Sequence, residues 1–403
     1  MKKPKIIRIR RIGNLIAFCA MSAILFFTST YAWFIGMQTV SVSNFDIEIS
    51  VTDSLSISLD AEEWKDSVTI SKATLDEDSY TGHTNSWGGD GLFPLSSVGD
   101  IDTDVSRLIF YEKSSLTATD GGYRLLASRL DNYTPGQPEH DGYVAFDMFI
   151  RNFSGNQYIE ALNILDEEAI YLTTDSAVTV GSMGVENTGI ENSVRVAFAQ
   201  IGRVEGTTED VAAIMGITCQ PEAESGVTGI CRTAQIWEPN DTSHNANAIR
   251  WYNTSCRART GADVTSSESY SGSCGTIEDG VAYPTYAVRE EITSADNVDI
   301  YDGTEYNGYT ATTKLYAFPY FTDTMKMKTG TDRPPFMMLA PNSITKVRVY
   351  VYLEGQDIDN YDFSSIGKQI SVNFGFTKQR IIEADIDYDG PELNEGFGPE
   401  TEE

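Results

Sequence analysis

Histidine and cysteine are scarce in this chain, with three and five copies among 403 residues. The histidines, His83, His140 and His244, are scattered, and no two cysteines have the CxxC spacing. Little material is therefore left for a zinc site or a histidine-based triad. The sequence also lacks a GxSxG elbow, an HExxH motif and a phosphate-binding glycine loop. We expect a protein that is not an enzyme, although two carboxylates placed for glycoside hydrolysis would leave no motif.

Positive charge is scarce beyond the first eleven residues. The chain has 29 basic and 59 acidic residues, a formal net charge of −30. Six of the basic residues precede Gly13, so the remainder carries 23 basic against 59 acidic residues. Such an acidic surface repels phosphate, and we expect no nucleic-acid partner. It favours cations as ligands or counter-ions.

One long hydrophobic run is present, at residues 12–37, and the six basic residues stand directly before it. A basic start, an apolar centre and a small-residue exit at Ala32 follow the plan of a secretory signal, with cleavage after Ala32. If it is retained, the run is long enough for a membrane-spanning helix with the basic end in the cytoplasm. Both alternatives predict export, either to the extracellular space or to the cell surface with a membrane contact through residues 12–37.

Apolar residues alternate with polar ones along most of the remaining chain, a period typical of half-buried strands. The pattern predicts little helix and an all-β fold, an antiparallel β-sandwich of jelly-roll type spanning residues 38–382. The expected strands are residues 39–49, 54–60, 64–70, 107–112, 123–128, 142–151, 170–173, 177–180, 193–199, 311–318, 345–353 and 369–377.

Five of these strands carry more specific expectations. Residues 54–60 and 64–70 are predicted to form a hairpin, after which residues 79–104 form a long loop. Residues 142–151 are apolar on both faces, which favours a central strand. Residues 345–353 are expected to place one face in the core and the other in water. The polar face consists of Lys346, Arg348, Tyr350 and Tyr352, and the strand is predicted to pair antiparallel with residues 369–377.

Residues 205–285 contain four of the five cysteines, Cys219, Cys231, Cys256 and Cys274, and few apolar residues. We interpret this segment as a loop insertion held covalently by two disulfides. Pairing Cys219 with Cys231 and Cys256 with Cys274 closes the shortest loops, and two other pairings remain open. A short helix is expected at residues 209–217, capped by Thr207 or Thr208. Residues 383–403 are acidic and predict a disordered tail.

Acidic residues cluster in three places. Asp100, Asp102 and Asp104 have a spacing that suits calcium, with solvated charge as the alternative. A run at residues 385–390 begins like an EF-hand loop but lacks its twelfth-position glutamate and its helices. Asp357 and Asp359 are interpreted as part of a turn rather than as ligands. No other cofactor is expected.

Three tryptophans, Trp87, Trp237 and Trp251, lie in loop-like sequence rich in polar residues. Exposed aromatic rings of this kind could stack on sugar rings. The other interpretation is that they fill gaps in an irregular surface.

The string TSTYAWF, followed directly by TVSVSNFDIEI, resembles the N-terminus of the TasA/camelysin-like surface proteins of Gram-positive bacteria. The strings VRVYVYLEGQD and IWEPNDTSHNANAI are similar to segments of related uncharacterised surface proteins. The resemblance implies a jelly-roll-like sandwich and a signal segment cut by a SipW-type peptidase, at the position that matches Ala32.

The resemblance and the strand pattern together predict a non-catalytic structural protein of the cell surface or biofilm matrix. Cleavage at Ala32 would release residues 39–49 as an N-terminal strand that could join a neighbour's sheet and form fibres by self-assembly. The alternative is a membrane-anchored carbohydrate-binding or adhesion module that depends on calcium.

Overall fold

The structure is a computed structural model that describes residues 44–51, 54–77, 83–89, 91–119, 122–131, 133–134, 137–182, 184–239, 244–248, 285–292, 315–318, 335–357, 359–360 and 369–378. The predicted signal or anchor segment with Ala32, the predicted tail, Cys256, Cys274 and Trp251 lie outside these residues. Among the described residues, no helix is both long enough and apolar enough to cross a membrane.

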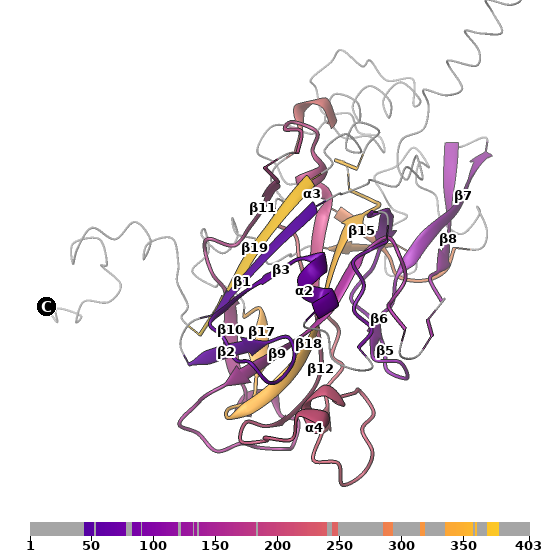
Figure 1. Ribbon diagram of the computed structural model, residues 1–403. Helices are drawn as coiled ribbons and strands as arrows, with labels where there is room; N and C mark the ends of the chain where they lie inside the picture. The colour runs from indigo at the N-terminus through magenta and orange to yellow at the C-terminus, as the bar shows by residue number, and fades with distance from the viewer. Residues whose placement is uncertain are drawn as a thin grey trace, which may run out of the picture.

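Strands dominate the described chain, and the helices are short (Figure 1). The helices are α2 (Lys72–Glu77), η1 (Ile164–Asp166), α3 (Ile190–Ser193) and α4 (Val211–Met215). The strands are β1 (Asn44–Val51), β2 (Leu55–Ser58), β3 (Ser67–Ile70), β4 (Pro94–Ser96), β5 (Ile101–Asp102), β6 (Arg107–Leu108), β7 (Tyr111–Thr119), β8 (Gly122–Arg129), β9 (Val144–Asn152), β10 (Glu168–Leu172), β11 (Ala177–Val180), β12 (Val194–Glu205), β13 (Thr228–Gly229), β14 (Gln235–Trp237), β15 (Thr285–Val288), β16 (Leu315–Phe318), β17 (Met337–Leu339), β18 (Ser343–Glu354) and β19 (Gln369–Thr377).

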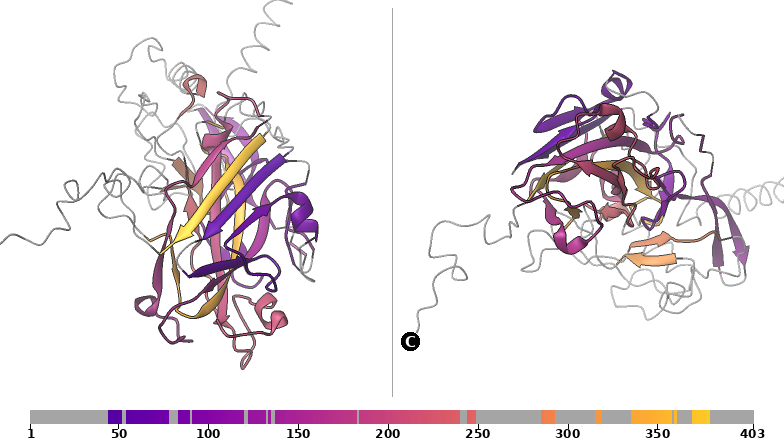
Figure 2. Two further views of the ribbon diagram at one scale, coloured as in Figure 1. Left: turned by 60° about the vertical axis from the view of Figure 1, so that its left-hand side comes forward. Right: turned by 90° about the horizontal axis from the view of Figure 1, so that it is seen from below.

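A six-stranded sheet contains the first and the last described strands side by side (Figure 2). Its order is β17-β10-β19-β1-β3, with β11 also paired to β19. β1 runs parallel to β19 in a register that begins with Asn44 opposite Gln369. On its other edge β1 pairs antiparallel with β3. β1 is therefore an interior strand, with hydrogen-bonded neighbours on both sides.

A nine-stranded sheet is built around β18, which pairs antiparallel with β12 and with β9. β2 extends the sheet beyond β9, while β13 and β14 pair with β12. β4 joins the end of β18 in parallel and leads to the β7–β8 hairpin. Because strands dominate, the predicted all-β class is confirmed. Both large sheets contain parallel as well as antiparallel pairs, so the prediction of a purely antiparallel arrangement is wrong.

The main hydrophobic core lies between the two large sheets. β19 contributes the side chains of Val372, Phe374 and Phe376, which are fully buried. Every second residue of β18 faces them, including Val349 and Val351. This is the expected consequence of period-two alternation, because one face of each strand turns toward the partner sheet. The core-facing side predicted for β18 is confirmed.

The opposite face of the nine-stranded sheet is also buried, in a second core. Tyr350 and Tyr352 of β18 are not exposed there, and Lys346 and Arg348 retain only 4% and 6% of their accessible surface. Apolar side chains from loops and from α4 cover this face, among them Phe110 and Ile214. The expectation that this side of β18 faces water is therefore wrong. The covering residues come from segments far away along the chain.

Two predicted pairings are corrected by the topology. β18 and β19 lie in different sheets and do not pair, because each faces the other across the core. β2 pairs with β9 and β3 pairs with β1, so they form no regular hairpin. A single bridge, between Ile57 and Lys65, links the two segments near the predicted turn.

Other local predictions fare better. β9 is a central strand whose residues are all buried except Arg151, as its two apolar faces indicate. The predicted helix exists as α4, but its N-cap is Asp210, whose side chain accepts hydrogen bonds from Ala212 N and Ala213 N. The prediction of a loop at residues 79–104 is wrong in part, because this segment contains the short strands β4 and β5. The described part of the predicted insertion returns β13 and β14 to the sheet.

Candidate functional site

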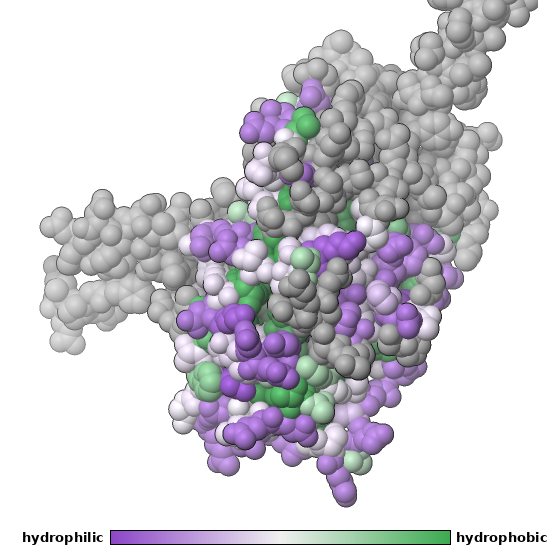
Figure 3. Space-filling view, in the orientation of Figure 1, coloured by the Kyte–Doolittle hydropathy of each residue, from purple (hydrophilic) through white to green (hydrophobic). Residues whose placement is uncertain are grey.

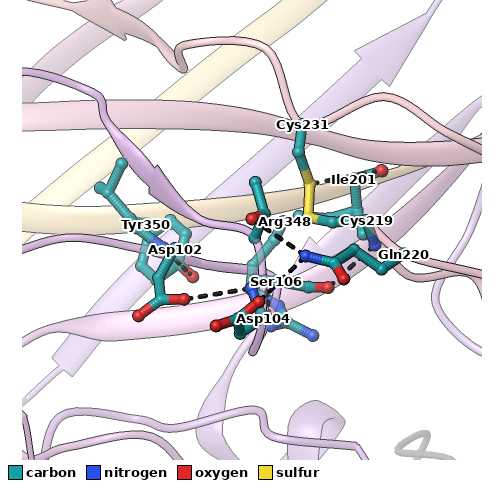
Figure 4. Close-up of a disulfide and its surroundings, with 11 residues drawn as sticks. Asp102, Asp104, Ser106, Ile201, Cys219, Gln220, Cys231, Arg348 and Tyr350 are labelled. Carbon is teal, nitrogen blue, oxygen red and sulfur yellow. Dashed lines mark hydrogen bonds between the residues drawn. A yellow bond between two sulfur atoms is a disulfide. The ribbon is translucent and has the colours of Figure 1, made fainter.

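The acidic run and the first cysteine pair, which are far apart in the sequence, meet at one place in the structure (Figure 4). Asp104 Oδ1 accepts a hydrogen bond of 3.0 Å from Gln220 Nε2, and Gln220 directly follows Cys219. The backbone N–H of Cys219 donates to Ser106 Oγ over 2.9 Å. The loop after β5 is thereby fixed to the cysteine loop.

Cys219 and Cys231 form a disulfide, with their Cα atoms 5.4 Å apart. The predicted pairing of these two cysteines is confirmed. The bridge closes the loop that contains β13, and the N–H groups of Ile230 and Cys231 bond back to β12 carbonyls. The disulfide therefore holds a loop with few apolar residues against the edge of the nine-stranded sheet.

The carboxylates of Asp102 and Asp104 in the acidic run contact protein groups. Asp102 forms an ion pair with Arg129 and accepts a hydrogen bond from Asp104 N. These hydrogen bonds and the Arg129 charge outweigh the effect of partial burial and lower the pKa of Asp102. The backbone carbonyl of Asp100 accepts from Ile109 N. Calcium binding by this run remains a prediction.

A buried network of charged and phenolic groups lies beneath this loop. Arg348 Nη1 donates to the carbonyl of Ser106 over 2.9 Å, and two further guanidinium N–H groups bind the carboxylate of Asp147. The hydroxyl groups of Tyr143 and Tyr350 donate to opposite oxygens of Glu139. This network ties β18 and β9 to the loops that cover the second core.

Burial dominates the electrostatics of the network. It raises the pKa values of Glu139, Tyr143 and Tyr350 and lowers the pKa of Lys346. All these side chains are almost wholly excluded from water, so no substrate can reach them in this structure. The arrangement is suited to fixing the loops rather than to acid–base catalysis. Sequence reasoning missed it because Lys346, Arg348 and Tyr350 were assigned to a solvent-facing strand side, and their partners lie far away along the chain.

A shallow surface hollow of about 250 Å³ lies beside β3, lined by residues that include Asp60, Glu63, Lys65 and Thr69. It is smaller than typical ligand pockets. None of its lining residues is aromatic. The hollow therefore offers no ring on which a sugar could stack.

The tryptophans predicted as sugar-stacking or gap-filling residues are placed inside the protein where they are described. Trp237 is fully buried in the main core and meets Phe374 edge to face. Trp87 is partly buried and packs against the same core. Both serve packing, in agreement with the gap-filling alternative.

One group of potential metal ligands lies elsewhere. Among the described residues, this group consists of His244, Asp357 and Asp359. One potential ligand atom from each side chain lies within 4.8 Å of the other two. The aspartates were assigned to a turn and His244 to no site. The two segments are separated by more than a hundred residues, so local sequence gave no signal for their contact.

Comparisons with known proteins returned no match: no family model matches the chain, and neither a curated protein nor a solved structure was found to resemble it.

Proposed function

We propose that this chain is an exported, non-catalytic structural protein of the cell surface or extracellular matrix, built as a jelly-roll-like sandwich. The observation that carries the proposal is the position of β1 between β19 and β3. The strand nearest the proposed export segment is thus an integral part of the sheet. Residues 12–37 and the resemblance to TasA/camelysin-like proteins support export, and the Cys219–Cys231 disulfide suits an oxidising compartment.

The same position supplies a mode of self-assembly. Ile47 and Ile49 of β1 are fully buried between the sheets. If β1 of one molecule took this place in the next, every backbone hydrogen bond and core contact of the strand would be kept. Such an exchange of identical elements between molecules costs little free energy, because the same contacts form again. The added strand also forms main-chain hydrogen bonds with the sheet that receives it. Cleavage after Ala32 would free the chain end that such an exchange requires.

An apolar loop offers a further contact surface. Five large apolar side chains, Phe153, Ile159, Leu162, Ile164 and Leu165, lie within 13 residues and are between 39% and 91% exposed. Arg203 Nη2 holds this loop in place by binding the carbonyls of Ile159 and Ala161. Hydrophilic residues dominate much of the described surface in the view of Figure 3. An ordered apolar loop on such a protein is typical of a contact with another macromolecule.

A paired-cysteine experiment tests the assembly. Glu48 of β1 lies opposite Thr69 of β3, and both are exposed. The double variant Glu48→Cys/Thr69→Cys should form the bond between molecules in an exchanged assembly and within one molecule otherwise. We expect a ladder of linked oligomers on non-reducing gels for the secreted protein, and no ladder for Glu48→Cys alone. Monomers with only the internal bond, at all concentrations, would refute the exchange.

Export is tested separately by mass spectrometry of the native protein. We expect a mature N-terminus at Trp33 and no free thiol on Cys219 or Cys231. A chain recovered from the cytoplasm with both thiols free would contradict the proposal, whatever the outcome of the crosslinking.

The carbohydrate-binding alternative gains no specific support. Trp237 is in the core, Trp87 packs against it, and the hollow beside β3 lacks aromatic residues. We therefore do not propose it as a second function.

A further inference from the structure

Three strand ends meet at one end of the nine-stranded sheet. β12 begins where β14 and β18 end, because it pairs antiparallel with both: Val196 is opposite Trp237, and Val194 is opposite Leu353. Arg195, near the start of β12, is thereby brought to Glu238 and Glu354, which stand at the ends of the other two strands.

Arg195 is surrounded by carboxylates. Its Nη2 group contacts both Glu238 Oε1 and Asp357 Oδ2, while Nη1 donates to the carbonyls of Asn192 and Val194. The turn after β18 adds Asp359, whose N–H donates to Asp357 Oδ1 over 2.8 Å. Glu238, Glu354, Asp357 and Asp359 are all at most 7% exposed. Four carboxyl groups therefore share one site that is nearly closed to water.

His244 approaches the same site from the segment after β14. Its Nδ1 lies 2.8 Å from Asp359 Oδ2, and its side chain is only 6% exposed. The other ring nitrogen, Nε2, is buried and has no hydrogen-bond partner among the described residues. Gln356 lies in the same turn and is 2% exposed, and the described part of the chain offers no partner to either of its side-chain polar atoms. Buried polar groups without partners are rare in native proteins and require an explanation.

The position of Asp359 is closely defined. Its Oδ1 accepts a hydrogen bond of 2.7 Å from Asn245 N. Gly189 approaches the same atom so closely that a β-carbon there would lie 2.7 Å from it. The backbone at Gly189 has φ +82°, a conformation that glycine adopts freely. The carboxylate is thus held in one orientation by two other segments, as preorganised ligands are.

The charges in the site do not cancel. Even with His244 protonated, two cationic groups face four carboxyl groups, and burying an uncompensated charge is costly. The protein groups described here therefore leave negative charge that a bound cation would neutralise.

We propose that His244, Asp357 and Asp359 bind a divalent transition-metal ion such as Zn²⁺. Their ligand atoms all lie within 4.8 Å of one another. An ion with ligand bonds of ~2.0–2.2 Å can reach such a set after small adjustments. An imidazole ligand suits zinc and similar ions, whereas calcium and magnesium prefer oxygen ligands. The ion would link the segment after β14 to the turn after β18.

Zinc titration of the untagged full-length chain, after removal of metals with a chelator, tests this site. We expect one Zn²⁺ per chain by calorimetry and an increase in Tm, and an excess of Ca²⁺ should not displace the bound Zn²⁺. His244→Gln, which keeps a donor for Asp359, should weaken zinc binding about 100-fold or more, because even the loss of an orienting partner costs 10–100-fold. His83→Ala is the matched control and should bind as the wild type does.

Failure of zinc to bind, or equal binding by the His244→Gln variant, would overturn the proposal. If that variant does not fold, the wild type decides the question. Cu²⁺ loaded at one equivalent should show pulsed-EPR modulation from one imidazole, and only a large excess of Zn²⁺ should compete with it. A Cu²⁺ signal without imidazole nitrogen would overturn the proposal in the same way.

Discussion

Arg348 of β18 and Asp147 of β9 stand directly opposite each other and form a two-point ion pair in the second core. Arg348 Nε lies 2.7 Å from Asp147 Oδ1, and Nη2 lies 3.1 Å from Oδ2. Both side chains are at most 7% exposed. Bidentate geometry of this kind is the strongest form of such a pair.

Arg348→Met should reduce the free energy of unfolding by ~3–5 kcal/mol, because it leaves the buried carboxylate of Asp147 without its main partner. Urea denaturation measures this change. The partly exposed pair of Arg129 and Asp102 provides the comparison, since Arg129→Met should cost no more than ~1 kcal/mol. In the double variant Asp147→Asn/Arg348→Met, part of the loss should be recovered. Equal losses for the buried and the partly exposed pair would contradict this view of the second core.

Glu354 predicts a specific dependence of stability on pH. Burial raises the pKa of its folded form from 4.5 to about 8. The stabilisation that it contributes is therefore complete below about pH 4.5 and is lost as the pH rises toward 8, because the unfolded chain ionises first. Glu354→Gln should remove this loss and stabilise the protein at pH 8 relative to wild type, by up to ~3–5 kcal/mol.

Unfolding curves at several pH values, recorded with a chelator present, check this prediction. Glu48→Gln changes an exposed glutamate of β1 and serves as the control. If the wild type and Glu354→Gln lose stability in parallel between pH 5 and 8, then Glu354 is not the group responsible.

The alternation of apolar and polar residues predicted the positions of the strands better than it predicted which residues pack against them. Residues 369–377 were predicted to the residue as β19, because alternation over nine residues gives a clear period. Lys346, Arg348, Tyr350 and Tyr352 look solvent-facing for the same reason. Their burial depends on partners such as Ser106 and Glu139, which lie more than 200 residues away. The alternation along one strand does not show whether distant segments of the chain will bury its polar face.

Of the candidate sites, one could be predicted from the local sequence and the other could not. The Cys219–Cys231 pairing was predictable, because few cysteines are present and the shortest loop is the cheapest to close. The grouping of His244 with Asp357 and Asp359 was not, since it depends on the register of β12 with β14 and β18. A lone histidine and two aspartates in a turn give no local signal. That register brings together the ends of β14 and β18, from which the two segments continue.

The Cys219–Cys231 disulfide should stabilise the fold by ~3 kcal/mol, the entropic value for closing a loop of this length. The variant Cys219→Ser/Cys231→Ser should therefore unfold at a lower urea concentration with a similar slope. The slope should be preserved because the main core lies between the sheets, away from this loop. Adding a reductant should destabilise the wild type toward the level of the variant and affect the variant less. If both proteins respond equally to the reductant, the stabilisation does not reside in this bond.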